Sequence, residues 1–305
     1  MSTSKTLKLA KEIYTNQTGT TYGHVKNLDG SLFLFEDTFL PASSKQPEFF
    51  ENALHYVGEA SKTSKFQRSI YITKKELSYV SKAMASRDVR YYLNGLAVYK
   101  NGNICATDGH RCHGFINSES DKSFKTDDAS LLPNYAIKTL LRIMTAKTFR
   151  IDVKISENGY GFLNIDNSNV TIVFKSIDGR YPDVERVIWP HKNKSTTWLA
   201  GIDIKRLKDE IKPFCNKKYN GIKLDLEQKT IVASNPDSGE HVFENAFYKC
   251  TETSDFSIGF NINYLIDALN DGNKHHFCDF IVSDKNSCGV VKTGNLMAVI
   301  MPMRL

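Results

Sequence analysis

The feature that most constrains the fold of this chain is an internal repeat, because one pattern of elements starts near Ile72 and again near Ile202. Each copy opens with a polar residue suited to cap a helix, Thr73 or Asp203, and continues as an amphipathic helix. Each then reaches an Asn-Gly pair and two strands that end in Ala-Thr-Asp or Ala-Ser-Asn. A repeat of this length indicates duplication and predicts a pseudo-symmetric molecule.

A second helix and a meander of strands follow each copy. Residues 132–147 carry apolar side chains at helical spacing, and strands are predicted near 149–157, 160–167 and 170–178. The counterpart is a helix over 261–271 with strands near 276–284, 288–294 and 296–303. The predicted class is therefore α+β, with a helix-plus-antiparallel-strand unit used twice in each of two domains, at about 69–194 and 195–305.

Residues 1–68 amount to roughly half a domain of this size, so we interpret them as a shortened N-terminal region, for which a degenerate half domain is one alternative. Residues 6–16 and 46–62 are predicted helices. A β-hairpin is predicted over 24–41, turning at Asp29-Gly30.

Composition and termini favour a globular, cytoplasmic protein. The chain of 305 residues is 41% hydrophobic and 24% charged, with no apolar run of about 18 residues that could span a membrane. Its first residues lack the apolar core of a signal peptide. The six cysteines show no framework spacing, so free thiols are expected.

One cluster, Cys105, His110, Cys112 and His113, raises the alternative of a zinc site. Its spacing fits no common zinc pattern, and neighbouring ligands on a strand would point to opposite faces. His110 beside Asp108 could act as a general base, but no nucleophile accompanies it. We therefore predict no metal, no cofactor and no enzymatic activity.

The net charge is +6, and its distribution is more informative than its size. Three of the four repeat helices carry basic residues opposite their apolar stripe, namely Lys75 and Lys82, Lys138 and Arg142, and Lys205, Lys208 and Lys212. A solvated surface is the ordinary interpretation of one such stripe. The same sign on equivalent helices instead suggests a common anionic partner such as DNA phosphate.

Five motifs resemble those of the bacterial sliding clamp, the β subunit of the replicative DNA polymerase III, in the same order along the chain. They are "DVRYYLNG" (88–95), "ATDGHR" (106–111), "DGRYPDVERVI" (178–188), "IGFNINYLIDALN" (258–270) and "VIMPMRL" (299–305). The resemblance covers about 69–305, the family's middle and C-terminal domains. It implies the DNA clamp fold, assembled into a ring whose helices surround duplex DNA, and the function of a processivity factor in DNA replication.

The resemblance also implies a hydrophobic pocket in which replication proteins, including the polymerase and the clamp loader, insert short peptides. Adaptable side chains such as Met301 and Met303 suit a pocket with many partners, although residues 299–301 could simply be a last strand. Cys112 and Tyr219 replace a larger aliphatic residue and a Phe of the family. The implied pocket residues are Leu93, Thr107, Gly109, His110, Arg111, Cys112, Pro182, Arg186, Val187, Tyr219, Asn261, Tyr264, Val299, Ile300, Met301, Pro302, Met303, Arg304 and Leu305.

DNA contacts and a subunit interface are implied as well. Tyr91 and Tyr92 match family positions on a loop near the face of the ring, although one of the two could instead be a core residue, because neighbours on a strand point to opposite faces. Arg87 stands where some relatives have an uncharged residue and could add a phosphate contact beside the basic helix residues named above. Pro213 and Phe214 match the subunit contact. Since about six domains surround a duplex in the family, two domains per chain favour a homotrimer over a dimer. The alternative is a clamp-like decoy or regulator that binds clamp-interacting peptides without encircling DNA.

Overall fold

The structure is a computed structural model of the chain. It describes residues 22–28, 31–37, 64–118, 123–125, 129–144, 148–157, 159–165, 170–188, 196–201, 204–244, 249–250, 256–270 and 277–304. The predicted helices at 6–16 and 46–62 lie outside these residues.

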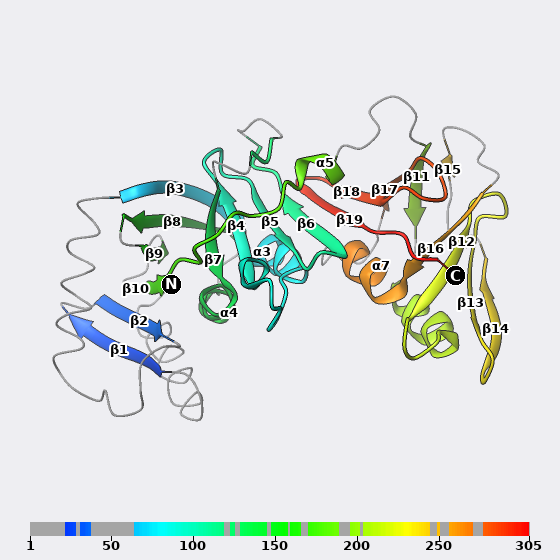
Figure 1. The fold of residues 1–305 in the computed structure, drawn as a ribbon, viewed down its shortest axis with the longest axis horizontal. Coiled ribbons are helices and arrows are strands. Elements are labelled where there is room, and N and C mark those ends of the chain that lie inside the picture. Colours follow the sequence, from blue (N-terminus) through cyan, green and yellow to red (C-terminus); the bar gives the residue numbers. More distant parts are fainter. Residues whose placement is uncertain are drawn as a thin grey trace.

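A unit of one strand, one helix and three further strands occurs four times (Figure 1). The first two copies are β3 (Ser64–Thr73), α3 (Lys74–Ser81), β4 (Gly95–Tyr99), β5 (Ile104–Thr107) and β6 (Arg111–Phe115), then β7 (Ala129–Pro133), α4 (Asn134–Ile143), β8 (Thr148–Ser156), β9 (Tyr160–Ile165) and β10 (Val170–Lys175). The third copy has β11 (Thr196–Gly201), a helical segment, β12 (Gly221–Asp225), β13 (Thr230–Asn235) and β14 (Gly239–Phe243); the fourth has β16 (Ser257–Asn261), α7 (Ile262–Leu269), β17 (Phe277–Val282), β18 (Gly289–Thr293) and β19 (Leu296–Ile300). The predicted duplication is confirmed.

The opening strand of each copy pairs with the meander of its neighbouring copy. Strand β3 pairs with β8 and β7 pairs with β4, while β11 pairs with β17 and β16 pairs with β12, all antiparallel. This exchange ties two copies into one unit. We refer to β3–β10 as the first unit and to β11–β19 as the second unit.

The two units share a continuous sheet. Strand β6 of the first unit pairs antiparallel with β19 of the second, giving a nine-stranded sheet in the order β15-β11-β17-β18-β19-β6-β5-β4-β7, in which β15 is Lys249–Cys250. A four-stranded sheet, β14-β13-β12-β16, leaves β14 at one edge.

The N-terminal region contributes two strands to the third sheet. Strands β1 (Tyr22–Leu28) and β2 (Ser31–Asp37) form an antiparallel hairpin in which Leu28 lies opposite Ser31. The pairing confirms the predicted hairpin. Strand β2 then pairs parallel with β10, so the sheet runs β1-β2-β10-β9-β8-β3.

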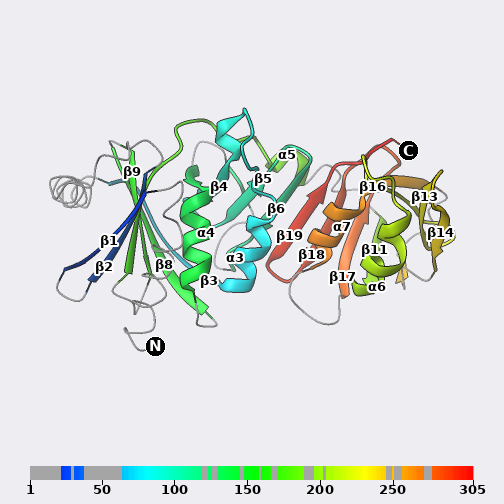
Figure 2. The ribbon, with the colours of Figure 1, turned by 90° about the horizontal axis from the view of Figure 1, so that it is seen from below.

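The helices lie side by side across one face of the sheets, as Figure 2 shows for α4, α3, α7 and the segment labelled α6. On that face the nine-stranded sheet contributes Leu96, Val98, Ile104, Ala298 and Ile300 to the main core. Its opposite face carries a second core, which includes Tyr99, Cys105, Cys112, Met297 and Val299 and is covered by Tyr181 and Val184. The central strands of this sheet therefore have nearly continuous apolar sequences, because both faces of the sheet are buried.

Local sequence explains how two helices begin. Thr73 caps α3 through a capping box, in which its hydroxyl accepts from the Glu76 N–H and the Glu76 carboxylate accepts from the Thr73 N–H. Asn261 caps α7 by accepting from the N–H groups of Asn263 and Tyr264. The predicted helix at 132–147 is shorter in the structure, because α4 ends at Ile143 and Met144 is extended.

The helical segment of the third copy is irregular. A short α turn, α6 (Ile204–Arg206), continues as a π-helical stretch (Leu207–Ile211) and a 3-10 turn (Lys212–Phe214). Its apolar stripe is buried as predicted, with Ile204, Leu207 and Ile211 in the core. In the part of the chain that the structure describes, no helix combines the length and apolar character needed to cross a bilayer.

Candidate functional site

A cavity of about 210 Å³ opens on the second-core face of the nine-stranded sheet, where the two units meet. Strands β5, β6 and β19 form its floor, and residues 182–187 form one wall. The cavity is mostly apolar, with arginines at its rim. Its lining residues are Arg90, Tyr92, Leu93, Thr107, Gly109, Arg111, Cys112, Pro182, Asp183, Val184, Val187, Val299 and Met301.

The wall at residues 182–187 is held by one buried tyrosine. The Tyr181 hydroxyl accepts a hydrogen bond of 2.8 Å from the Thr107 N–H in strand β5, and Tyr181 is almost fully buried. The short helix α5 (Glu185–Ile188) follows directly. Val184 and Val187 are therefore fixed facing the sheet, which keeps this wall of the cavity in place.

Arg90 at the rim is oriented by a carboxylate and a glycine. Its guanidinium makes two bonds to Asp88, of 3.0 and 2.8 Å, and donates to the Asp108 carbonyl at 3.0 Å. Hydrogen bonding from Arg90 lowers the pKa of the Asp88 carboxyl to about 2. Gly109 has a φ of +90°, a conformation that favours glycine, and a Cβ there would lie 2.6 Å from an Arg90 nitrogen and displace the guanidinium.

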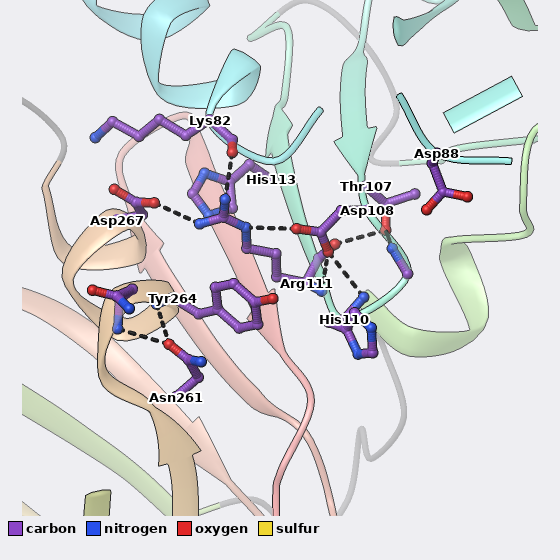
Figure 3. A network of polar contacts seen from close by, with 12 residues as sticks. Lys82, Asp88, Thr107, Asp108, His110, Arg111, His113, Asn261, Tyr264 and Asp267 are labelled. Carbon is purple, nitrogen blue, oxygen red and sulfur yellow. Dashed lines mark hydrogen bonds and ion pairs between the residues drawn. The ribbon is translucent and has the colours of Figure 1, made fainter. Parts of the chain in front are cut away.

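Arg111 lies at the centre of the polar network that joins the two units (Figure 3). Its guanidinium donates to Asp108 at 3.0 Å and to the Lys82 carbonyl at 2.6 Å in the first unit. It also pairs with Asp267 of α7 at 2.5 Å and lies over the Tyr264 ring, 4.6 Å from the centroid. Arg111 thus lines the cavity and bonds both units at once.

A ledge continues from the cavity across Arg111 onto the second unit, and we define it by Tyr219, Asn261, Tyr264 and Met303. The Asn261 amide donates to the Tyr219 carbonyl at 3.1 Å, and the Met303 N–H donates to the Gly259 carbonyl at 2.9 Å. Partial burial raises the pKa of the Tyr264 hydroxyl. Arg111, which lines the cavity and lies over the Tyr264 ring, connects the cavity with the ledge.

Beneath Arg111, helix α3 satisfies the C-terminal carbonyls of α7. The Tyr79 hydroxyl donates to the Ala268 carbonyl at 2.8 Å, and the Lys82 ammonium donates to the Asn270 carbonyl at 2.6 Å. His113 stacks on Tyr79 with ring centroids 4.6 Å apart, and its Nδ1 donates to the Tyr79 carbonyl at 2.8 Å. Complete burial lowers the pKa of His113 to about 4, so the ring is neutral near pH 7.

The structure brings nine of the predicted pocket residues into the cavity lining and distributes the others around it. His110 is exposed at the turn between β5 and β6, and Arg186 is an exposed partner of Asp183 at 2.9 Å. Ile300 is fully buried in the helix-side core, so its side chain is not in the cavity. Pro302 and Arg304 follow the last strand, and Leu305 lies outside the described residues.

Three lining residues were not predicted from the sequence, namely Arg90, Asp183 and Val184, and a fourth, Tyr92, was predicted as a DNA contact and not as a pocket residue. Arg90 and Tyr92 lie within the quoted "DVRYYLNG" motif, and Asp183 and Val184 lie within "DGRYPDVERVI". The motifs therefore contained the signal. Which of their side chains face the cavity depends on contacts with strands β5 and β6, and no local pattern gives these.

The basic residues predicted on the helices are mostly exposed. Lys75 on α3, Lys138 and Arg142 on α4, and Lys205, Lys208 and Lys212 in the 204–214 segment are all exposed, on the helix side of the sheets (Figure 2). Lys82 differs, because it is half-buried and its ammonium is bonded to the Asn270 carbonyl. Its charge sits at the C-terminal end of α7, where a cation is favourable.

The predicted DNA loop and subunit contact are also on the surface. Tyr91 is 59% exposed and meets Tyr92 edge-on in the 3-10 helix η1 (Tyr91–Leu93), and Arg87 is exposed with a φ of +60°. Pro213 is exposed, whereas Phe214 is half-buried and stacks on His241 of the edge strand β14, with centroids 5.0 Å apart.

The fold is that of a DNA clamp. It has four strand–helix–meander copies whose opening strands are exchanged, with the helices on one side and the sheets on the other. Solved structures agree. A DNA polymerase sliding clamp from Pseudomonas aeruginosa, solved with a ligand, superposes with a TM-score of 0.64 at 24% identity, covering 97% of this chain and 80% of that one.

Sequence comparison is more specific. Residues 70–183 match the family model of the DNA polymerase III beta subunit, central domain. The beta sliding clamp of Pseudomonas aeruginosa is 31% identical over 236 residues, and that of Escherichia coli K12 is 28% identical over 231 residues, each match covering 73% of this chain. The chain is therefore a relative of the bacterial beta sliding clamps, with a DNA polymerase III beta central domain at residues 70–183.

The match does not extend over whole relatives, since it spans 61% of the length of each of these beta sliding clamps.

Proposed function

We propose that this protein is a DNA sliding clamp, a non-catalytic processivity factor that encircles duplex DNA and tethers a DNA polymerase through peptides bound in the cavity. The observation that carries the proposal is the apolar cavity with its ledge, built from all five motifs at the junction of two clamp units. Its relatives are themselves named sliding clamps. Because a sliding clamp acts on DNA, the proposal includes a cytoplasmic location.

The surface suits an extended peptide with an apolar end. Leu93, Val187, Val299 and Met301 provide apolar contact in the cavity, while the backbone and Asn261 on the ledge provide polar contact. Pockets of this kind, apolar with a few placed polar groups, are typical ligand sites. We expect a peptide with a Gln and a Leu-Phe-like end to bind with its apolar end in the cavity and its Gln near the ledge.

The helix side suits duplex DNA. Six exposed basic residues, Lys75, Lys138, Arg142, Lys205, Lys208 and Lys212, lie on helices that share one side of the sheets. Attraction to phosphate needs no base contacts, so binding should be independent of sequence and fall steeply with salt. Lys82 is not in this set, because it is half-buried.

The test measures binding of a fluorescent peptide of this type by anisotropy. Met301→Glu places a charge in the cavity at a side chain that is 38% exposed, and Val242→Glu makes the same change on β14 at a side chain that is 41% exposed. Loss of an apolar anchor costs about 2 kcal/mol, or roughly 30-fold in affinity. We expect that loss for Met301→Glu and none for Val242→Glu. Equal affinity in both variants would refute the cavity as the peptide site.

A further inference from the structure

Two buried thiols lie in contact under the cavity. Cys105 in β5 and Cys112 in β6 have sulfur atoms 3.1 Å apart, and both are free cysteines. The register places Cys105 opposite Gly114 and Cys112 opposite Thr107, so the two cysteines are diagonal neighbours on one face of the antiparallel pair. Gly114 has no side chain, and the Cys105 sulfur instead contacts Cys112.

The two sulfurs differ in their access to solvent. Cys112 lines the cavity and retains 4% exposure, whereas Cys105 lies behind it with none. Val299 of β19 lies directly opposite Cys112 on its other side. A small reagent that enters the cavity therefore meets Cys112 first, and Cys105 is reachable through Cys112.

We propose that Cys105 and Cys112 form a reversible dithiol–disulfide site in the floor of the cavity, which small disulfides oxidise. In the first step the Cys112 thiolate attacks one sulfur of the small disulfide, forming a mixed disulfide and releasing one thiolate. In the second step the Cys105 sulfur attacks the Cys112 sulfur and releases the second small thiol. The protein loses two hydrogen atoms, and the reagent is reduced to two thiols.

The geometry makes the second step intramolecular and the product easy to reduce. The sulfur atoms must approach by about 1 Å to reach an S–S bond length of about 2.05 Å. Diagonal neighbours on a sheet have Cα atoms about 7–8 Å apart, longer than a relaxed disulfide spans, so β5 and β6 must shift. A disulfide under such tension has an oxidising potential and behaves as a labile, regulatory bond.

The order of the steps predicts a dependence on pH. Burial raises the pKa of the Cys105 thiol well above its ordinary value, with the contact to Cys112 adding to the effect. The second step needs that thiol deprotonated, so it speeds up as pH rises. The mixed disulfide at Cys112 should accumulate near neutral pH and convert to the internal disulfide in more alkaline buffer.

The experiment treats the full chain with bis(2-hydroxyethyl) disulfide, a small neutral reagent, and follows the intact mass. Trypsin cleaves after Arg111, between the two cysteines, so the disulfide appears as two linked peptides. We expect that linkage in the wild type treated in alkaline buffer, and its loss after reduction. Cys215→Ala, which changes a buried thiol in the main core, should leave it intact.

Two variants separate the steps. Cys105→Ala should stop at one hydroxyethylthio group on Cys112, and Cys112→Ala should leave Cys105 unmodified. A wild-type protein whose Cys105 and Cys112 both remain free thiols after treatment overturns the proposal, as does a Cys105→Ala protein unmodified at Cys112. The readout is chemical, so the result is independent of whether the cavity binds peptides.

Discussion

Arg111 shows how much one side chain contributes to the site. Its guanidinium has carboxylate partners in both units, a carbonyl partner at the end of α3 and an aromatic ring beneath it. Such forked, charge-assisted bonding is a property of Arg that Lys does not share. The motif "ATDGHR" predicted Arg111 as a site residue. Its partner Asp267 lies 156 positions away in sequence, so the network could be identified only in the structure.

His113, buried beside this network, gives the first prediction at the scale of the residue. Its folded pKa of about 4 lies below the unfolded value of 6.5, so the unfolded chain binds more protons between these values. Stability from neutral His113 is therefore present above about pH 6.5 and is lost as pH falls towards 4. From about pH 7 to about pH 5 the loss is about 2 kcal/mol.

The measurement is the free energy of unfolding in urea against pH, for the wild type and for His113→Asn. Asn keeps a donor for the Tyr79 carbonyl and does not titrate. The carboxylates contribute equally to both proteins, so the difference between the two curves isolates His113. We expect the free energy of unfolding of the variant, relative to that of the wild type, to rise by about 2 kcal/mol as the pH falls from about 7 to about 5. Parallel curves would show that His113 is not buried in the neutral form.

At the scale of the element, the contact between α3 and α7 gives a second prediction. The end of a helix leaves carbonyls without partners, and α7 has two of them satisfied by α3. Tyr79→Phe removes the donor to the Ala268 carbonyl and leaves that buried oxygen unpaired, at a cost of about 1–3 kcal/mol.

A matched control lies in the same unit. Tyr99 is equally buried, but its hydroxyl has no hydrogen-bond partner among the described residues. Tyr99→Phe removes an unsatisfied polar atom and should be neutral or stabilising. Urea unfolding of both variants checks the pair. If the two substitutions cost the same, the bond from Tyr79 to α7 contributes nothing to the stability of the junction.

Sequence patterns predicted most elements and missed how they pair. The helices and meanders followed from 3.6-residue and two-residue periodicity, and the predicted cap Thr73 is confirmed. The other predicted cap, Asp203, lies outside the described residues, and the cap Asn261 was not predicted. The opening strands β3, β7, β11 and β16 were not predicted as a class. Each pairs with a meander of another copy, and such long-range pairing leaves no local signature. The same reason explains the unpredicted cavity residues Arg90 and Val184.

At the scale of the whole molecule, the proposed ring would have to close through strands at the outer edges of the sheets. Strand β14 ends one sheet and β1 ends another, and both are unpaired edges among the described strands. Unpaired edges are templates for pairing with another chain. A head-to-tail interface that closes gives a ring, and one that does not gives a filament. Pro213 and Phe214 lie beside β14, in agreement with their proposed role at the subunit contact.

The third prediction is the oligomeric state, measured by light scattering on the full chain. We expect three times the chain mass of 34.5 kDa, because two clamp units per chain reach six with three chains. A dimer would mean that the N-terminal region, with its hairpin on β10, serves as a third unit. A strict monomer would refute the ring and favour the decoy.

A shortened protein separates the trimer from the dimer. A start at Ser69 would cut through β3, which pairs with β8 from Ser64 onwards, so the shortened chain should start at Ser64. If the trimer needs only the two units, it should persist after this deletion. If the shortened protein dissociates while its circular dichroism spectrum shows that it is still folded, the subunit contact belongs to residues 1–63.

The last residues of the chain are held in place by their main chain. The Met301 N–H bonds to the His110 carbonyl at 3.0 Å, and the Met303 N–H bonds to the Gly259 carbonyl at 2.9 Å. Any residue except proline, which has no backbone N–H, can donate these bonds. Residues 301 and 303 can therefore be randomised together, as the variable positions of a selection library, with the backbone still in position. Under the proposed function, selection from such a library would yield variants that bind a chosen peptide and not the natural one.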